Sequence, residues 1–181
     1  MLKVGVHSDL HTEFSVCTIT NLPELDVLVL AGDMGDLSSM AHFLGLIRRK
    51  APGLPVLYVL GNHEYDTVKE YKKARAFLHE ALRSENKTVR KKVVISHFLP
   101  AFELLATAYR QNTDALIQSA YWATDIPQLH QLADDWIYGH SHDCIETTVG
   151  TTRFLSNQRG YSKVMNRAQS ADYRRDYCIE V

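Results

Sequence analysis

Residues 27–36, with the sequence VLVLAGDMGD, decide the fold of this chain. The first five residues are apolar and mostly branched, which is typical of a strand that is buried on both faces. Gly32 then allows a sharp turn, and Asp33 follows directly at the carboxyl end of the strand. Ligands of α/β sheets bind beyond these carboxyl ends. The stretch therefore predicts an α/β domain with a polar site at that edge of the sheet.

Further apolar runs of strand length lie on both sides of this stretch. One run precedes it, and the runs that follow are separated by intervals that leave room for helices. The alternation is the pattern of an α/β domain. The expected strands are residues 2–7, 27–31, 56–60, 93–95 and 136–138, followed by 145–149, 152–156 and 177–181 near the end of the chain.

Two intervals between the strands show apolar residues at helical spacing. Either Ser38 or Ser39 is the expected N-cap of the first helix, because a hydroxyl oxygen can accept a hydrogen bond from the first turn. We expect the two helices to cover one face of the sheet. The residues that show the spacing are Met40, Phe43, Leu44 and Ile47 in the first helix and Val68, Tyr71, Leu78 and Leu82 in the second.

The length and composition of the chain fit a single domain. A chain of 181 residues, of which 45% are apolar, is large enough for one substantial core. We therefore expect residues 1–181 to form one domain. Residues 98–125 break the pattern of strands and helices and are bounded by Pro100 and Pro127. We expect this segment to form a cap or lid.

The charge balance and the cysteines limit the partners and the compartment. A formal net charge of -1 gives no positive field for a phosphate backbone, which disfavours long nucleic acids as partners. Cys17, Cys144 and Cys178 are odd in number and widely spaced, so neither a disulfide framework nor a cysteine-zinc site is expected. Residues 1–8 are too short for a signal peptide, and no apolar run is long enough to span a membrane. We therefore expect a cytoplasmic protein.

The first five strands each end in residue types that commonly bind metals. Because the carboxyl ends of such strands meet at one edge of the sheet, we expect these residues to converge although they lie far apart in sequence. Three of the ends carry a glycine before the polar residue, which lets the backbone approach an ion closely. The five ends read Ser8-Asp9-Leu10-His11, Gly32-Asp33-Met34-Gly35-Asp36, Gly61-Asn62-His63-Glu64, Ser96-His97 and Gly139-His140-Ser141-His142.

The side chains at these ends form a donor set that suits transition metals. Carboxylates, an amide and imidazoles together match Mn, Fe, Zn, Ni or Co better than the all-oxygen shells of Ca or Mg. The set is too large for one such ion, but it fits two divalent ions if one carboxylate bridges them. Paired ions about 3.5–4 Å apart are a recurrent arrangement for the hydrolysis of phosphate esters. The expected ligands are Asp9, His11, Asp33, Asn62, His97, His140 and His142.

The five ordered motifs resemble those of the calcineurin-like metallophosphoesterase superfamily, in particular its small bacterial members. The resemblance implies an α/β/β/α sandwich and hydrolysis of a phosphate ester by a metal-activated water. It further implies that His63 stabilises or protonates the leaving-group oxygen and that Asp36 orients His63. The implied ligands of the first metal are Asp9, His11, Asp33 and His142, and those of the second are Asp33, Asn62, His97 and His140, with Asp33 as the bridge.

The resemblance extends to the tail of the chain and has two departures. The segment Asn157-Gln158-Arg159-Gly160-Tyr161 is similar to one that follows the last metal motif in small bacterial members, where Arg159 would face the substrate. After His97 the family often has a second histidine and a small residue, whereas this chain has Phe98 and Leu99. The interval between residues 64 and 93 is also short, so the sheet is expected to be trimmed on one edge. Exposed edge strands are commonly hidden by pairing, and a homodimer is one way to hide this edge.

Two kinds of function compete for this sequence. The first is an enzyme, a phosphodiesterase or phosphatase that acts on a small soluble ester, with nucleotides among the candidate substrates. The second is a non-catalytic scaffold that keeps the fold for protein interaction. The presence of every metal-ligand position, together with His63 and Asp36, favours the enzyme. The choice between monoesters and diesters stays open.

Overall fold

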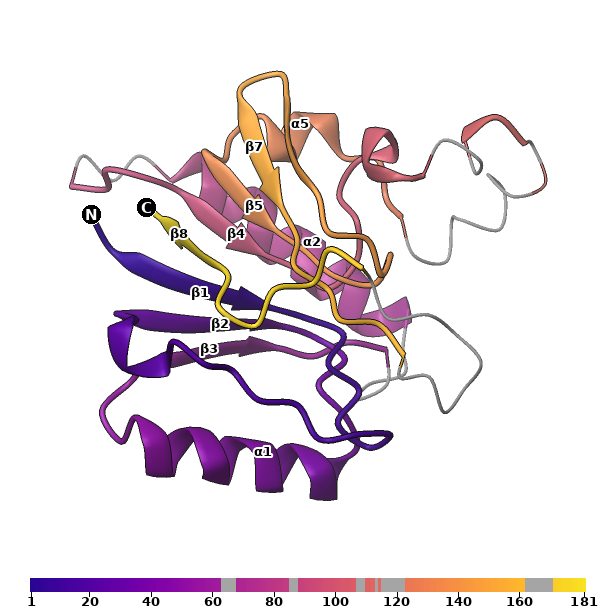
Figure 1. Ribbon diagram of the computed structural model, residues 1–181. Helices are drawn as coiled ribbons and strands as arrows, with labels where there is room; N and C mark the ends of the chain where they lie inside the picture. Colours follow the sequence, from indigo (N-terminus) through magenta and orange to yellow (C-terminus); the bar gives the residue numbers. More distant parts are fainter. Residues whose placement is uncertain (63–67, 85–87, 107–109, 113, 115–122, 162–170) are drawn as a thin grey trace.

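The protein is described here by a computed structural model, which covers all residues except 63–67, 85–87, 107–109, 113, 115–122 and 162–170. Two sheets stack on each other (Figure 1). All eight expected strands are present, and each end differs from its expected position by at most one residue. The first sheet has the order β3 (Val56–Val59), β2 (Val27–Ala31), β1 (Lys3–His7) and β8 (Cys178–Glu180). The second sheet has the order β4 (Val93–Ile95), β5 (Asp135–Ile137), β7 (Thr152–Leu155) and β6 (Glu146–Val149).

The strands that lead into the polar motifs are parallel within each sheet. β1, β2 and β3 run in parallel, and β8 closes the first sheet as an antiparallel neighbour of β1. In the second sheet β4, β5 and β7 run in parallel, and β6 pairs with β7 in the antiparallel sense. The carboxyl ends of the motif-bearing strands therefore lie at a common edge of each sheet.

Alternate residues of the strands face an apolar layer between the sheets and apolar clusters on their outer faces. Val6 and Val29 of the first sheet face Ile137 and Leu155 of the second, so that an apolar layer separates the sheets. The intervening residues point outward, where helices cover them. The result is an α/β/β/α sandwich, as the family resemblance implied.

The two main helices lie on different sheets, and the expectation that they cover one face was wrong. In α1 (Leu37–Lys50), Phe43 packs with Leu28 on the outer face of the first sheet, together with apolar residues of the loop after β1. In α2 (Val68–Arg83), Leu82 packs with Trp136 on the outer face of the second sheet. Apolar spacing marks the inner side of each helix, but it does not say which sheet that side will meet.

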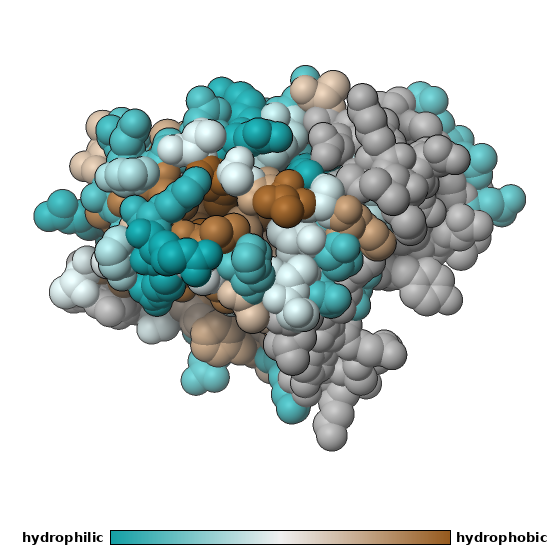
Figure 2. Space-filling view, turned by 60° about the horizontal axis from the view of Figure 1, so that its bottom comes forward, coloured by the Kyte–Doolittle hydropathy of each residue, from teal (hydrophilic) through white to brown (hydrophobic). Residues whose placement is uncertain are grey.

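The N-cap of α1 is Asp36, not Ser38 or Ser39 as expected. The Asp36 carboxylate accepts a hydrogen bond from the Ser39 backbone N–H at 2.8 Å, and the helix begins at Leu37. An aspartate cap also places a negative charge at the positive end of the helix dipole. At the other end of α1, Arg48, Arg49 and Lys50 are exposed. Figure 2 views the side of the molecule on which α1 lies and shows a mixed surface, with apolar groups in its middle and polar groups around them.

Part of the described portion of the predicted lid packs into the core, and the rest of that portion is largely exposed. The segment contains η2 (Phe102–Leu104), and α5 (Pro127–His130) follows it. Leu99 pairs with Ala123 in an isolated bridge, and both residues are buried in the core on the outer side of the second sheet. Much of residues 107–122 lies outside the described residues, so the function of the segment as a lid stays a prediction.

The short interval after residue 64 leaves an open edge. Among its described residues, α2 is the only regular element, and the flanking strands β3 and β4 are edge strands. Leu57 and Val93 lie on the inner faces of these two strands, yet they are 49% and 37% exposed. The edge thus lacks part of the apolar cover that central strands have. None of the helices in the described ranges has the length and apolarity needed to span a membrane.

Candidate metal centre

Six of the seven expected ligands form two groups at the carboxyl ends of the strands. The first group, from the loops after β1 and β5, is Asp9, His11 and His142. The second group, from the loops after β2, β4 and β5, is Asp33, His97 and His140. Within each group, one possible ligand atom per residue lies within 4.8 Å of the others. Both groups therefore have the compactness that a metal ion requires.

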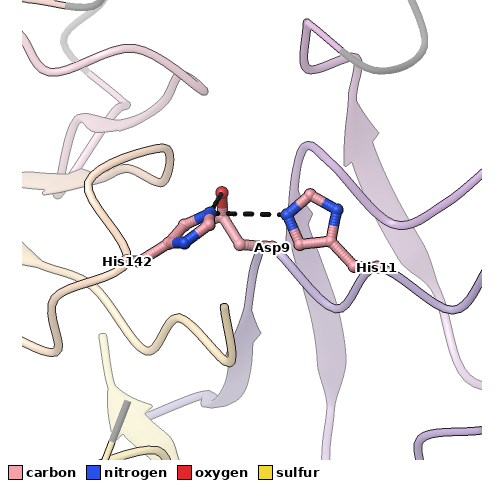
Figure 3. A group of neighbouring side chains, drawn as sticks. All are labelled: Asp9, His11 and His142. Atoms are coloured by element: carbon pink, nitrogen blue, oxygen red, sulfur yellow. Dashed lines mark hydrogen bonds and ion pairs between the residues drawn. The ribbon is translucent and has the colours of Figure 1, made fainter. Parts of the chain in front are cut away.

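In the first group the three side chains point toward one another (Figure 3). The Nε2 atoms of His11 and His142 are 3.4 Å apart, and His142 Nε2 is 3.4 Å from Asp9 Oδ1. Asp9 and His11 are buried, whereas His142 is partly exposed. The other ring nitrogen of His11, Nδ1, lies 3.2 Å from a carboxylate oxygen of Glu13. A carboxylate in that position fixes the ring of a ligating histidine and raises its basicity.

In the second group His97 lies at the centre. Its Nε2 atom is 3.3 Å from Asp33 Oδ2, and it is 3.1 Å from both His140 Nδ1 and Asn62 Oδ1. Asn62, the seventh expected ligand, therefore lies beside the second group. The Nδ1 atom of His97 is 2.9 Å from the carbonyl oxygen of Ala31, which holds the ring from behind. Ser96, the neighbour of His97, accepts a hydrogen bond from the Trp136 indole at 2.8 Å.

The two groups are joined by Asp9 and Asp33. The His140 backbone N–H, in the second group, is 3.1 and 3.0 Å from the two carboxylate oxygens of Asp9 in the first. The His11 N–H donates to the carbonyl oxygen of Asp33 at 3.1 Å. The Asp33 carboxylate also contributes to the pKa of both His11 and His97. Asp33 therefore lies near residues of both groups.

Two glycines make this close approach possible. A Cβ atom at Gly61 would collide with the carboxylate of Asp33. A Cβ atom at Gly139 would lie 2.7 Å from the Ala31 carbonyl oxygen and 2.8 Å from Asp9 Oδ2. Because neither neighbour has room to move inside the packed site, both positions require a residue without a side chain.

The backbone at the site is strained. Among the described residues, the non-glycine residues with positive φ all belong to the two groups: Asp9, His11, Asp33, His140 and His142, with φ between 44° and 74°. This left-handed region costs a non-glycine residue roughly 1–3 kcal/mol, and the strain persists only where surrounding contacts enforce it. Such clustering is typical of functional sites, where a less stable backbone conformation orients particular side chains.

The charges of the site give its histidines different proton affinities. Burial by itself would lower the pKa of His97, but the bond to Asp33 and the charge of Asp9 outweigh it and raise the pKa to about 9. Burial, reinforced by the charge of His97, lowers the pKa of His140 to about 4. Burial also lowers the pKa of His11, against the opposing charge of Asp9. In the metal-free protein burial thus favours the neutral form of His140 and His11, whereas the ion pair with Asp33 favours the cationic form of His97.

The carboxylate of Asp9 stays ionised although it is fully buried. Burial would raise its pKa, but the hydrogen bond from His142 and the charges of His97 and His142 lower it. A buried carboxylate among imidazoles is a favourable place for a cation, because removal from water is costly for a charge that lacks a partner. The donor chemistry of both groups thus fits a divalent metal ion.

Aromatic rings flank both groups. The Tyr161 ring stacks on His11 with centroids 4.3 Å apart, and Phe14 lies 6.1 Å from His11. On the side of the second group, the Phe98 ring lies 5.3 Å from His97 and 5.0 Å from His140. Phe98 is 37% exposed, so its ring forms part of the surface beside the site.

The remaining sequence-predicted site residues lie in different environments. His63 is outside the described residues. Asp36 is exposed and caps α1, which accounts for its carboxylate without reference to His63. Arg159 is buried, and its guanidinium donates to the loop that carries His11, through Leu10 and Ser15. These contacts hold the loop, and contact of Arg159 with a substrate stays a prediction.

The sequence analysis missed Glu13 and Gln158. Glu13 orients His11, and Gln158 contacts the turn that carries His142 through its side-chain amide. The spacing His-x-Glu at residues 11–13 is a weak signal for the first. For Gln158 there was only its place next to Arg159, because a glutamine without a charged or apolar pattern has no sequence signature.

Comparison with known proteins places the chain in a family. The family model described as the calcineurin-like phosphoesterase superfamily domain matches residues 2–157. A solved structure, described as a conserved uncharacterized protein and predicted phosphoesterase from Streptococcus pneumoniae TIGR4, matches with 15% identity and a TM-score of 0.41, over 89% of this chain and 76% of that one. No curated protein is significantly similar. Since the family model spans most of its length, this chain belongs to the calcineurin-like phosphoesterase superfamily.

Proposed function

We propose that this protein hydrolyses esters of phosphate with the help of two divalent transition-metal ions. Mn, Fe, Zn, Ni and Co are the candidate metals, and manganese is the first to test. The observation that carries the proposal is the pair of adjacent donor groups, with Asp33 in contact with His97 of the second and with the backbone of His11 in the first. A mixture of carboxylate and imidazole donors suits these metals better than Mg or Ca.

The residues of each group have distinct roles in this proposal. The first ion would be held by Asp9, His11, Asp33 and His142, and the second by Asp33, Asn62, His97 and His140. When bound, such a pair of ions activates a water molecule for attack on phosphorus and stabilises the charge that develops on the phosphoryl oxygens. Glu13 and the Ala31 carbonyl keep the rings of His11 and His97 in the tautomer that leaves Nε2 free to coordinate.

The charge of the site favours an anionic substrate. Two divalent ions bring four positive charges, of which the two carboxylates Asp9 and Asp33 neutralise only half. The remaining charge is available for a phosphate group. The partly exposed residues His140 and His142 lie on the accessible side of the groups, where a small ester would bind.

The proton for the leaving group is assigned to His63 because of its place in the sequence, directly after Asn62. An imidazole with an ordinary pKa can donate a proton near neutral pH. Asp36 is proposed to orient His63, a role that would be additional to its capping of α1.

The aromatic rings beside the groups favour a substrate with a planar organic part. Phe98 presents an exposed ring next to the second group, and rings in such positions stack on nucleobases or aryl groups. Small nucleotides and related diesters are therefore the proposed substrate class. Because the three cysteines Cys17, Cys144 and Cys178 are odd in number and widely spaced, we propose the reducing cytoplasm as the compartment.

A substrate panel tests this function. Metal-free protein is loaded with Mn, Fe, Zn, Ni or Co in turn and assayed with bis(p-nitrophenyl) phosphate and p-nitrophenyl phosphate. We expect turnover with at least one metal and none after chelation. Absence of turnover with every metal, together with tight binding of a protein partner, would instead establish the scaffold function.

We also propose that the protein forms a homodimer through the open edge at β3. Leu57 and Leu60 at this edge are 49% and 48% exposed, and an uncovered apolar edge strand favours pairing. Light scattering should give twice the monomer mass, and Leu57→Lys should return it to that of one chain. A monomer at concentrations well above those of the assay contradicts the proposal.

A further inference from the structure

We propose that the segment Asn157-Gln158-Arg159, called the clamp below, is a positioning device for the first group. Its side chains hold the loops of Asp9, His11 and His142 in the geometry that binds the first metal ion. The inference rests on the proposed function and adds to it residues that touch neither ion nor substrate.

The clamp passes from one sheet to the other. It follows β7 of the second sheet and then pairs with the end of β1 in the first, since Ser8 N–H donates to the Asn157 carbonyl and Arg159 N–H donates to the Ser8 carbonyl, each at 3.2 Å. The exposed fractions of Asn157, Gln158 and Arg159 are 2%, 0% and 6%. The first group also draws on both sheets, with Asp9 and His11 after β1 and His142 after β5. The clamp therefore lies where the two parts of this group must be joined.

Gln158 holds the turn of His142. Its side-chain oxygen accepts a hydrogen bond from the His142 backbone N–H at 2.5 Å, and its side-chain nitrogen donates to Ser141 Oγ at 2.9 Å. The amide thus uses both of its ends on two successive residues. Both contacts fix the backbone from which the His142 ring projects.

Arg159 holds the loop of His11. Its Nη1 atom donates to the carbonyl oxygens of Leu10 at 2.9 Å and Ser15 at 3.1 Å, and Nη2 donates to Ser15 Oγ at 2.6 Å. A planar guanidinium can hold several acceptors in one fixed arrangement, which a lysine cannot reproduce. The acceptors lie on both sides of His11 in the sequence, so the guanidinium closes the loop around that residue.

Asn157 anchors the clamp itself. Its side-chain nitrogen donates to the carbonyl oxygens of Val6 at 2.9 Å and Arg174 at 2.8 Å, and its side-chain oxygen accepts from the Arg174 N–H at 3.0 Å. One contact is to β1 and the others are to the segment that leads into β8. The clamp is therefore fixed to the first sheet before it reaches the metal-site loops.

The strained backbone explains why such a device is needed. Asp9, His11 and His142 all have positive φ, and without external contacts they would relax to more favourable conformations. The residues after the clamp add to the restraint. Gly160 lies against the His142 ring, and Tyr161 stacks on His11 at 4.3 Å. The second group has other supports, namely the Ala31 carbonyl behind His97 and the Asn62 side chain.

Metal titrations of clamp variants test the inference. Gln158→Met and Arg159→Met remove the polar contacts and keep much of the side-chain volume. We expect each to weaken binding of one Mn²⁺ ion by about 10–100-fold, the usual effect of losing support behind a ligand, and to leave the other ion unchanged. His142→Ala and His97→Ala supply the reference behaviour for loss of the first and second ion. Gln128→Met and Arg49→Met, at exposed positions, are matched controls that should bind both ions like the wild type.

Each outcome decides the question. Selective loss of the ion that His142→Ala also loses supports the clamp, whereas equal weakening of both ions, or wild-type affinity for both, overturns it. If a methionine variant does not fold, Gln158→Glu keeps the acceptor for the His142 N–H and loses the donor to Ser141, and unchanged Mn²⁺ affinity in that variant overturns the role of Gln158. A wild type that binds no ions refutes the proposed function as well. A wild type with two ions and unaffected variants refutes the clamp alone.

Discussion

The two donor groups have similar composition, but different parts of the molecule hold them in place. The second group is supported mainly by neighbouring strand ends, through the Ala31 carbonyl and the bond between His97 and Asp33. The first group depends on the clamp at residues 157–159, which lies far along the chain from Asp9 and His11. Two adjacent donor groups can therefore be held in place by different parts of the chain.

The two groups also differ in the pKa values of their histidines. The second contains His97, whose ion pair with Asp33 outweighs burial and gives a pKa of about 9. The first group contains His11, and burial lowers the pKa of this residue. In the absence of metal the second group therefore holds a proton where a cation would bind, while the first group relies on backbone contacts for its geometry.

Asp33→Asn should have the largest effect, because Asp33 is proposed to bind both ions. Loss of one negative charge at the bridging position should reduce turnover by at least about 100-fold and weaken binding of both ions. Metal analysis by mass spectrometry together with the ester assay measures both effects. Asp172→Asn, at an exposed position, is the control. If only one ion is lost from Asp33→Asn, Asp33 is not the bridge.

His63→Ala should have the second-largest effect. It should lower turnover without weakening the binding of either metal ion. Loss of a general acid should lower turnover by about 100-fold and leave the metal content at the wild-type level. His42→Ala on the exposed side of α1 controls for loss of a histidine. Loss of both ions in His63→Ala would instead make His63 a ligand.

Phe98→Ala should have a smaller effect, confined to the side of the second group. Stacking on an exposed ring contributes about 1–3 kcal/mol, and its lower end corresponds to an increase in KM of about fivefold for an aryl or nucleotide ester. An alkyl phosphate ester should show little change. The control is Phe102→Ala, a similarly exposed ring in η2 at 36% compared with 37% for Phe98. Equal changes for aryl and alkyl esters would remove Phe98 from substrate recognition.

Asp36 substitutions should have the smallest effect and should separate its two assigned roles. Asp36→Ala removes the cap of α1 and should lower Tm by about 2–4 °C, whereas Asp36→Ser keeps a capping oxygen and should restore most of that loss. Thermal unfolding and the ester assay are run on both variants. If Asp36→Ser has wild-type turnover, the carboxylate has no role in orienting His63.

The sequence predicted the strands well because buried parallel strands are short, continuous apolar runs. It did not predict the placement of α2, since the same apolar spacing serves a helix on either sheet and only the crossover after β3 decides. The cap of α1 was also missed. Asp36 falls within the motif after β2, and the two serines that follow it are equally good caps by residue type.

The candidate ligands were predictable because each is a chemically distinctive side chain directly after a strand. The residues that hold these ligands in place could not be predicted from the sequence. Glu13 and Gln158 act through contacts that exist only once the loops are folded, and Gln158 lies 16 residues from the His142 N–H that it holds. Arg159 was assigned to the substrate through the family resemblance of the segment that contains it, whereas its described contacts are with Leu10, Ser15 and Val16.

The position of β3 and β4 at the edges of their sheets predicts which metal ion would be released first. β3 and β4, which lead to Asn62 and His97, are edge strands, whereas β1, β2 and β5 lie inside their sheets. Edge strands open locally at lower free energy than central ones. We therefore expect slow release of metal from the folded protein to begin with the second ion, during brief fraying of β3 and β4. Amides of these two strands should exchange with deuterium faster than those of β1 and β2, and bound metal should slow that exchange.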